Sequence, residues 1–532
     1  MPAAAWKHRL VGLFFAVLLG LGLWLHRDYG VSWDEPVEHL NGMVSAKYIA
    51  QRLPPALAPD LTAYAWVPEL RTFQDSDHGS LFELVMVALG RLLAPGDSQG
   101  YYFLRHLLTF CTFGVGVWAL YRIASFRHRD WRWGLLAAAL LVISPRLFAE
   151  AFYNFKDVGF TALFTLGVYT LLHLHQRPSA ARAVVHGCVT AAAIDIRTAG
   201  LLLVALTAAW LAADAAAAGR RAVWRQLAVV GVLYAVATAA VTVAGWPYLW
   251  EAPASNLGRA LQRMSQFPWP HRVLYFGRLV SAQQLPWHYL PVWISLTTPL
   301  PVLLAGAGGL LAVLRATARA GCAAWRDAAL RLDWLMVAWL LGPLALVIGL
   351  KSVVYDGWRH LYFVYPALVL LAVRALRGLL ALARQRRPGW RWATGALALA
   401  VLETGHTAVR MVREHPFQQV YFGFLPARTA EHLFERDYWG LSYRQGLEWL
   451  LAHDPAPQLA INVPWHHPLY NNSLILPPAQ RARLRFVPLR RARYFLTAYR
   501  WHPQPYPPDS VGREIHRVQA GQLNILSVFR RY

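Results

Sequence analysis

Three carboxylates stand close together where the first apolar segment of the chain ends. Asp34, Glu35 and Glu38 fall within VSWDEPVEHL, residues 31–40, directly after an unbroken apolar run. A carboxylate held in place can take a proton from a hydroxyl nucleophile as a general base. The stretch also fits the first turn of a helix, where proline and acids are favoured. We take Asp34 as the candidate base and Glu38 as part of a helix start.

The composition indicates which class of protein must position these acids. Of 532 residues, 56% are hydrophobic and only 15% are charged, which is typical of a polytopic membrane protein. The formal net charge is +24, but the basic residues are scattered in short groups between apolar segments. Membrane topology requires that spacing, which argues against nucleic acid as a partner. Three cysteines are too few and too scattered for a disulfide framework or a zinc site.

Apolar runs long enough to cross a bilayer recur along the chain and predict an α-helical polytopic fold. The expected spans are 9–26, 101–124, 133–150, 158–175, 183–197, 199–217, 226–246, 290–314, 333–350, 359–381 and 392–411. No cleavage site follows the first, so it is expected to remain as an anchor. The pair at 183–217 could be one broken segment, and we count it as two because Asp195 and Arg197 interrupt it. The count is then eleven.

The distribution of arginine predicts the orientation of these spans. With the N-terminus in the cytoplasm, every cytoplasmic connection is rich in Arg, so the positive-inside rule favours an N-in, C-out topology. Residues 1–411 would form the transmembrane domain, with outer loops at 27–100 and 247–289. The first loop would include an amphipathic helix within 79–94. Residues 412–532, with alternating stretches such as QLAINV, RLRFVPL and LNILSVF, predict a small extracytoplasmic α/β domain.

In this topology five segments bring acids and bases to one leaflet. The residues are Asp34, Glu35, Asp75, Asp77 and His78 in the first outer loop; Arg105 and His106; Arg146, Glu150, Lys156 and Asp157; Asp195 and Arg197; and Lys351, Asp356, Arg359 and His360. Charges at membrane depth are costly and mark candidate functional sites. Cations suit a phosphate, and carboxylates suit a general base. Together they fit a lipid-phosphate-linked sugar attacked at its activated carbon, whereas nucleotide sugars would require a Gly-rich phosphate loop that the chain lacks.

Several motifs together resemble a known superfamily. An Asp-Glu pair after the first span, an amphipathic segment led by His, many spans and an extracytoplasmic tail resemble the GT-C glycosyltransferases. The similarity is strongest to the protein O-mannosyltransferase and aminoarabinose-transferase group, which uses polyprenyl-phosphate sugars. SWDE is similar to its Asp-Glu motif, DHGSLFELVMVALGRLL to its juxtamembrane helix, and YYFLRHLLTF to the start of its next span. His78 matches the motif's His, whereas Gly79 and Ser80 stand where that motif has prolines.

The resemblance implies roles for the acids and a class of reaction. Asp34 would be the base or orient the acceptor, Glu35 would support it, and Asp157 would position donor or acceptor. YDGWRHLYFVYP is a similar later element. Our own inference adds Arg105, Arg146, Arg197, Lys351 and Arg359 as candidate ligands of the donor phosphate. Further candidate substrate contacts are Asp77, His78, His106, Lys156, Trp269, His271 and His360.

The expected protein is a monomeric glycosyltransferase of a bacterial inner membrane, with its active site facing the periplasm. The donor is a polyprenyl-phosphate sugar, the acceptor is a lipid, glycan or protein, and single displacement predicts inversion at the anomeric carbon. No cofactor is required, although the carboxylates leave a divalent metal ion open. The alternatives are a transporter or flippase of a lipid-linked sugar, or an O-antigen polymerase or ligase.

Aromatic residues are dense in the second outer loop and again near Trp501. The loop contains MSQFPWPHRVLYFGRLVSAQQLPWHY, with Trp269 and His271 near its middle. Aromatic residues at this depth usually form an interfacial belt. The alternative is a platform for sugar or lipid, lined by Trp269, His271, Arg272 and His288. The WHH stretch at 465–467 lacks a further ligand at helical spacing, so we expect no metal site there.

Overall fold

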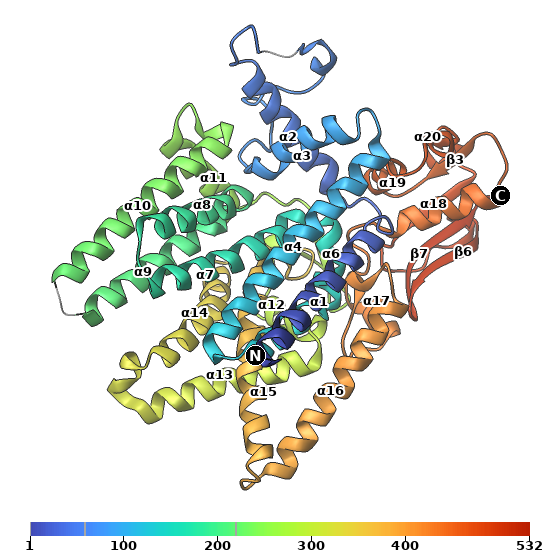
Figure 1. Cartoon of the computed structure of the whole chain (residues 1–532). Coiled ribbons are helices and arrows are strands. Elements are labelled where there is room, and N and C mark those ends of the chain that lie inside the picture. The colour runs from blue at the N-terminus through green and yellow to red at the C-terminus, as the bar shows by residue number, and fades with distance from the viewer. Residues whose placement is uncertain (1, 58–59, 219–220) are drawn as a thin grey trace.

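Long helices make up most of the computed structural model, which describes residues 2–57, 60–218 and 221–532 (Figure 1). The long helices are α1 (Pro2–Leu25), α4 (Ser98–His128), α7 (Phe160–Gln176), α8 (Ala180–Ile196), α9 (Leu201–Ala218), α10 (Arg221–Gly245), α13 (Leu300–Ala320), α14 (Ala328–Gly349), α15 (Tyr365–Arg384) and α16 (Trp390–Arg413). Within the described ranges, eight helices are long and apolar enough to cross a membrane, or nine if one bent pair counts as a span. The chain therefore has the character of a membrane protein, with fewer such helices than the eleven expected.

The bent pair falls on the expected span 133–150. Its halves, α5 (Trp131–Val142) and α6 (Pro145–Tyr153), meet at 72°. Ser144 between them has extended backbone angles, because the residue before a proline is disfavoured in the α conformation. The bend buries every residue of α6. Arg146 and Glu150 are thereby carried into the protein interior.

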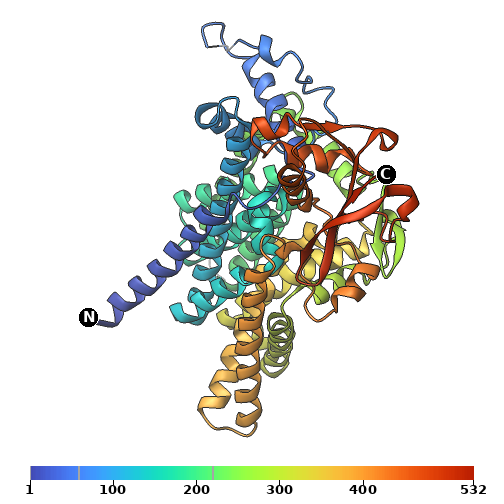
Figure 2. The same ribbon diagram turned by 90° about the vertical axis from the view of Figure 1, so that its right-hand side faces the viewer.

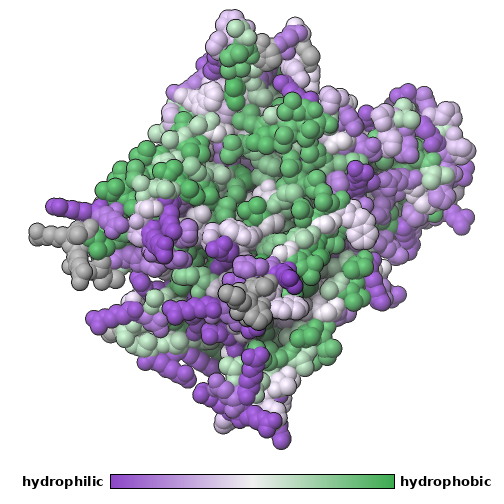
Figure 3. Space-filling model, viewed as in Figure 1, coloured by the Kyte–Doolittle hydropathy of each residue, from purple (hydrophilic) through white to green (hydrophobic). Residues whose placement is uncertain are grey.

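The expected span 290–314 is also interrupted. It is divided into α12 (Tyr289–Thr297) and α13 at Thr298 and Pro299, which are both extended. Two further expected spans, 183–197 and 392–411, form α8 and α16, but neither is among the eight membrane-length candidates. In the helical body α4 packs against α5 and α7, α8 against α10, and α13 against α15. Hydrophobic side chains cover much of this body in Figure 3.

Residues 27–100, the segment expected as the first outer loop, carry two helices at one end of the body. They are α2 (Glu35–Ala50) and α3 (Leu81–Leu93), which pack on each other (Figure 1). The helix expected within 79–94 is thus present as α3. The second outer loop contains α11 (Pro253–Ser265) and an antiparallel hairpin, β1 (Arg272–Tyr275) and β2 (Arg278–Ser281), which the alternation pattern did not single out.

The C-terminal part folds around a five-stranded mixed sheet (Figure 2). Its order is β4 (Leu484–Phe486), β3 (Leu459–Asn462), β5 (Tyr494–Thr497), β7 (Leu523–Arg530) and β6 (Arg513–Ala520), with α18 (Ser442–His453) packed on it. Strand β3 runs parallel to both of its neighbours, whereas β7 is antiparallel to β5 and β6. The small α/β domain predicted for residues 412–532 is present.

A short helix of this domain, α19 (His466–Ser473), holds the segment that leads to Asp34. The side chain of Asn472 accepts from the backbone N–H of Val31 over 3.1 Å and donates to its carbonyl over 3.2 Å. Asn471 donates to the carbonyl of Ser32 over 3.0 Å. Because both asparagines are buried, these bonds brace the backbone immediately before the candidate base.

Candidate active site

Asp34 and Asp157 lie on either side of one guanidinium. Arg359 donates through Nη1 to Oδ2 of Asp34 over 3.3 Å and to Oδ2 of Asp157 over 3.0 Å. Arg197 pairs with the other oxygen of Asp157. The side chain of Asp157 is fully buried, whereas that of Asp34 is 36% exposed. Asp34 is therefore the carboxylate of this network that an incoming hydroxyl group can reach.

The position of Asp157 is set by an irregular turn before α7. Residues Phe155–Gly159 form a π-helical turn, a feature frequent at functional sites. Asn154 caps this turn by accepting from the backbone N–H of Asp157 over 3.1 Å, and it donates to Oδ2 of Asp157 over 2.9 Å. Glu150 accepts from the side-chain amide of Asn154 over 2.7 Å. It also accepts from the hydroxyls of Tyr362 and Tyr438 over 2.8 and 3.1 Å. Glu150 thus links α6, the segment after Arg359 and the C-terminal part.

Glu35 supports the loop that carries Asp34. Its carboxylate accepts from the backbone N–H of Ser32 over 2.7 Å and lies 3.1 Å from Nε2 of His106. The other ring nitrogen of His106 lies 3.1 Å from the carbonyl of His26. Glu35 and His106 are fully buried, so both hold backbone in place rather than face an open cavity.

Arg105 lies in a separate buried cluster of acids. It donates to both oxygens of Glu83 over 2.6 and 2.9 Å, pairs with Glu38, and lies 3.6 Å from Glu35. Burial raises the pKa of Glu38 to about 8, and the opposing attraction of Arg105 only partly offsets it. The structure places Glu38 in the first turn of α2, but its carboxylate packs inside the protein instead of facing solvent. Since three acids surround Arg105, it is the least available of the predicted phosphate ligands.

Lys156 and His78 line a small cavity next to this cluster. Glu38, Phe82 and Asp195 complete its wall with their neighbours. In the part of the chain that the structure describes, Lys156 makes no ion pair, whereas Arg197 and Arg359 are both paired with carboxylates. Lys156 is therefore a cation that remains available to a ligand.

Asp77 contacts both His78 and Arg263 of α11. It is 3.2 Å from the His78 ring and 3.0 Å from Arg263. Burial opposes ionisation of Asp77, yet His78 and Arg263 outweigh it and lower the pKa of this carboxyl. Burial lowers the pKa of His78. The pair thus joins α11 to the segment that leads into α3.

Gly79 explains one departure from the resembling motif. A Cβ atom at this position would lie 1.4 Å from the carbonyl oxygen of Asp195, so no side chain fits. The Asp195 carboxylate accepts from the backbone N–H of Leu81 over 2.8 Å and so satisfies the start of α3. Close approach of α8 to the His78 loop therefore requires glycine here.

Three further predicted residues, Arg146, Lys351 and His360, have other surroundings than the Asp34–Asp157 pair. Arg146 donates to the carbonyl of Tyr421 over 3.1 Å and lies over the rings of Trp293 and Phe422. Lys351 is exposed and lines a different cavity, beside Trp287. His360 packs edge-on against the ring of Tyr355, 4.6 Å between centroids. Of the five predicted phosphate ligands, the structure brings Arg197 and Arg359 to the Asp34–Asp157 pair.

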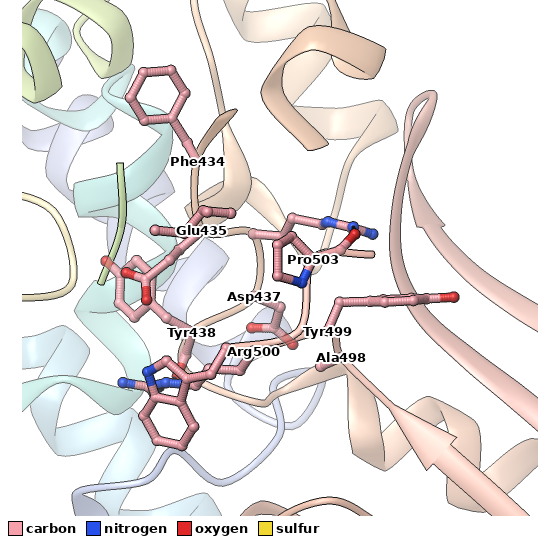
Figure 4. Close-up of a pocket in the computed structure, with 11 residues that line it drawn as sticks. Phe434, Glu435, Asp437, Tyr438, Ala498, Tyr499, Arg500 and Pro503 are labelled. Atoms are coloured by element: carbon pink, nitrogen blue, oxygen red, sulfur yellow. Dashed lines mark hydrogen bonds between the residues drawn. The ribbon is translucent and has the colours of Figure 1, made fainter. Parts of the chain in front are cut away.

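The network also includes Arg500 and Glu435, which the sequence analysis did not assign to the site. Arg500 donates to Oδ1 of Asp356 over 2.8 Å, and Arg359 lies 3.6 Å from Oδ2 of the same residue. Glu435 and Arg500 line one small pocket between residues 434–438 and 498–503 (Figure 4). Burial, together with nearby Asp356, raises the pKa of Glu435 to about 8. Asp356 could be found from sequence because it belongs to the YDGWRH element. Glu435 lies in the C-terminal segment, where we recognised no motif.

Among the described residues, no group of three or more His, Cys, Asp or Glu side chains is arranged to hold a metal ion. The acids at the centre are paired with arginine instead. No protein-family model matches the chain, and none of the curated proteins matches it. A functional assignment must therefore come from the geometry of these residues.

Proposed function

We propose that this protein is a membrane glycosyltransferase that moves a sugar from a polyprenyl-phosphate-linked donor to an acceptor hydroxyl group, with Asp34 as the general base. The observation that carries the proposal is the contact between Asp34 and Arg359. It sets an accessible carboxylate next to a guanidinium, which itself is anchored by buried Asp157. A proton acceptor and a phosphate ligand then stand side by side, as displacement of a phosphate from an anomeric carbon requires.

The proposed reaction is a single displacement. The acceptor oxygen forms a bond to the anomeric carbon, and its proton passes to the carboxylate of Asp34. The bond from that carbon to the phosphate oxygen breaks, and the polyprenyl phosphate leaves with the electron pair. Arg359, Arg197 and Lys156 would stabilise the leaving phosphate, and the sugar would be inverted. Asp157, bound by two arginines, would position their guanidinium groups.

Charged contacts near the two ends of α4 are consistent with a helix that crosses a membrane, with the candidate site near one end. Arg105 lies in the acid cluster near the N-terminal end, and Arg127 donates to Asp333 over 2.7 Å near the other. The two are 22 residues apart, about 33 Å of helix, which is about the thickness of a bilayer core. The Arg-rich connections expected on the cytoplasmic side add the orientation, and we propose the N-in, C-out topology with a periplasmic site in a bacterial inner membrane.

A transporter of a lipid-linked sugar is the alternative from another functional class. Such a protein would have its polar groups near the midplane, between matching repeats. Here they gather near the outer loops, and α19 of the C-terminal domain braces them. This arrangement favours an enzyme.

Incubation of the purified protein with a panel of polyprenyl-phosphate sugars and membrane extract as acceptor tests the proposal. Wild type should release polyprenyl phosphate and form a product of inverted anomeric configuration. Asp34→Asn should lose at least about 100-fold in rate, because an Asn cannot accept the proton. Asp60→Asn, in an exposed part of the same loop, is the matched control and should keep full activity. Full activity of Asp34→Asn, or a retained configuration, would contradict the mechanism.

A further inference from the structure

Six rings from five separate segments form a row beside the candidate base. We call this row the aromatic ledge, and its members are Trp33, Trp269, His271, Tyr355, Trp465 and Trp501. Trp501 stacks on His271 with 4.5 Å between centroids and meets Trp465 at 4.7 Å and Trp33 at 6.2 Å. Trp269 lies 5.1 Å from His271 and stacks on Tyr355 at 3.8 Å. The row is therefore continuous from the first outer loop to the segment before Arg359.

Both ends of the aromatic ledge reach the Asp34–Arg359 pair. Trp33 is the residue directly before Asp34. At the other end, the guanidinium carbon of Arg359 lies 5.0 Å from the ring centroid of Tyr355. A molecule lying along these rings would therefore have one part next to the candidate base.

Polar groups lie among the rings of the ledge. Its rings are partly exposed, and Trp465 is 42% exposed. Arg500 lies over the faces of Trp33 and Trp501, at 5.2 and 4.6 Å from the ring centroids. Within the described residues the indole N–H groups of Trp269 and Trp501 are shielded yet have no hydrogen-bond partner. Shielded donors without partners are rare in proteins and point to a missing acceptor.

The loop that presents Trp501 has an unusual backbone. Tyr499 and Trp501 have φ angles of 61° and 59°, and Asp356, which Arg500 contacts, has one of 56°. Bulky residues rarely adopt this left-handed conformation, which costs roughly 1–3 kcal/mol at each position. Strain of this kind persists where the surrounding structure enforces it, typically at ligand-binding sites. Here it holds the Trp501 ring against His271.

We infer that the aromatic ledge binds the acceptor and that the acceptor is a carbohydrate chain. This inference rests on the proposed function for the identity of the bound molecule as an acceptor. The C–H faces of sugar rings pack on aromatic faces, and their hydroxyl groups bond to the edges that His271, Arg500 and the free indole N–H groups offer. A lipid tail would need a continuous apolar groove, and the imidazole and guanidinium groups interrupt any such surface here.

Saturation-transfer NMR on the full chain in nanodiscs tests this inference without requiring turnover. The probes are linear trisaccharides of mannose, galactose and rhamnose, and an oligosaccharide from a lipopolysaccharide core. At least one should bind, and Trp501→Ala and Trp465→Ala should each weaken its binding about tenfold, a typical loss for a central aromatic contact. The matched control is Trp66→Ala, which removes an exposed tryptophan of the first outer loop and should bind as wild type does. Trp465 is the more exposed of the two ledge positions, so its variant should fold normally.

The outcomes separate this inference from the proposed function. Asp34→Asn should still bind the oligosaccharide, since binding does not require the base. Ledge-dependent binding without any glycosyl transfer would support the ledge and contradict the proposed function. Transfer that depends on Asp34 but not on Trp501 or Trp465 would overturn the ledge alone. Absence of binding by all four probes, or an equal loss of binding in Trp66→Ala, would also overturn it.

Discussion

Arg359 donates from a single Nη1 atom to Asp157, at 3.0 Å, and to Asp34, at 3.3 Å. The two acids differ in exposure, so the shared guanidinium joins a buried carboxylate to an accessible one. Their roles can be separated because only the accessible one can exchange a proton with a substrate.

Replacement of the two acids by Asn should have different effects on stability. Asp157→Asn leaves Arg197 and Arg359 without their buried counter-charge and should cost about 3 kcal/mol or more of stability. Asp34→Asn removes a partly exposed partner and should cost less than about 1 kcal/mol, although under the proposed function it slows transfer at least about 100-fold. Tryptophan-fluorescence melting curves of the two variants check this contrast. Equal melting temperatures would show that Asp157 does not anchor the arginines.

Arg359→Lys should lower the transfer rate by roughly 100-fold. Lysine keeps the charge but cannot reach Asp34, Asp157 and a phosphate in the same geometry. The rate of polyprenyl phosphate release by the purified variant is the measurement. Arg278→Lys, at an exposed position of β2, is the control and should behave as wild type does. A wild-type rate for Arg359→Lys would remove this residue from the mechanism.

Glu435→Gln should stabilise the protein at alkaline pH. The pKa of Glu435 is about 8 in the folded protein, above the ordinary 4.5, so the folded state binds its proton more tightly. Its contribution to stability is therefore complete below pH 4.5 and is lost as the pH rises through about 8. The variant should melt as wild type does at pH 5 and be more stable by on the order of 1–2 kcal/mol at pH 9. A difference of the same size at both pH values would contradict this assignment.

Asn472→Ala should impair transfer through the backbone before Asp34. The variant loses the bonds to Val31, and the backbone N–H and carbonyl of Val31, left buried without these partners, should cost roughly 1–3 kcal/mol. Asn462→Ala is the matched control, because within the described part of the chain the Asn462 side chain bonds to Val487 alone, inside the C-terminal domain. Both variants should melt earlier, but Asn472→Ala alone should lower the transfer rate at a temperature where both are folded. Equal rates would show that the brace does not position Asp34.

Gly79→Ala should disturb the segment that carries His78. The added methyl group would overlap the Asp195 carbonyl, so α3 and α8 would have to move apart. We expect a stability loss of about 1–3 kcal/mol in melting curves, typical of overpacking. Gly258→Ala, in α11, has open space around its Cβ position and should be neutral or slightly stabilising. A neutral Gly79→Ala would contradict the close packing described here.

Periodicity and apolar length predicted most of the elements but not how they are interrupted. The helices of the body, α3 in the first outer loop, and strands β3, β4 and β7 all fall where expected. Strand β5, Tyr494–Thr497, has no alternation to detect because all four residues are buried. The bend at Pro145 divided a span that hydropathy alone had read as continuous.

Sequence predicted which charged residues share the candidate site, but not how their side chains pair. Topology brings charges to one face, so the proximity of Asp34, Asp157, Arg197 and Arg359 could be anticipated. Side-chain pairing depends on tertiary packing, and sequence does not reveal that Glu38 and Glu83 surround Arg105. The contributions of Arg500 and Glu435 required the C-terminal domain to be placed.

The bonds from Asn472 to Val31 connect residues 441 positions apart in the chain. A ribosome that has inserted the first helix must therefore translate most of the protein before the brace can form. During that interval the nascent chain already carries Asp34, but the backbone before it is not yet held. Catalytic competence would then arise late in biogenesis, when the final domain docks. Under the proposed function, an incomplete chain would therefore not consume the lipid-linked donor.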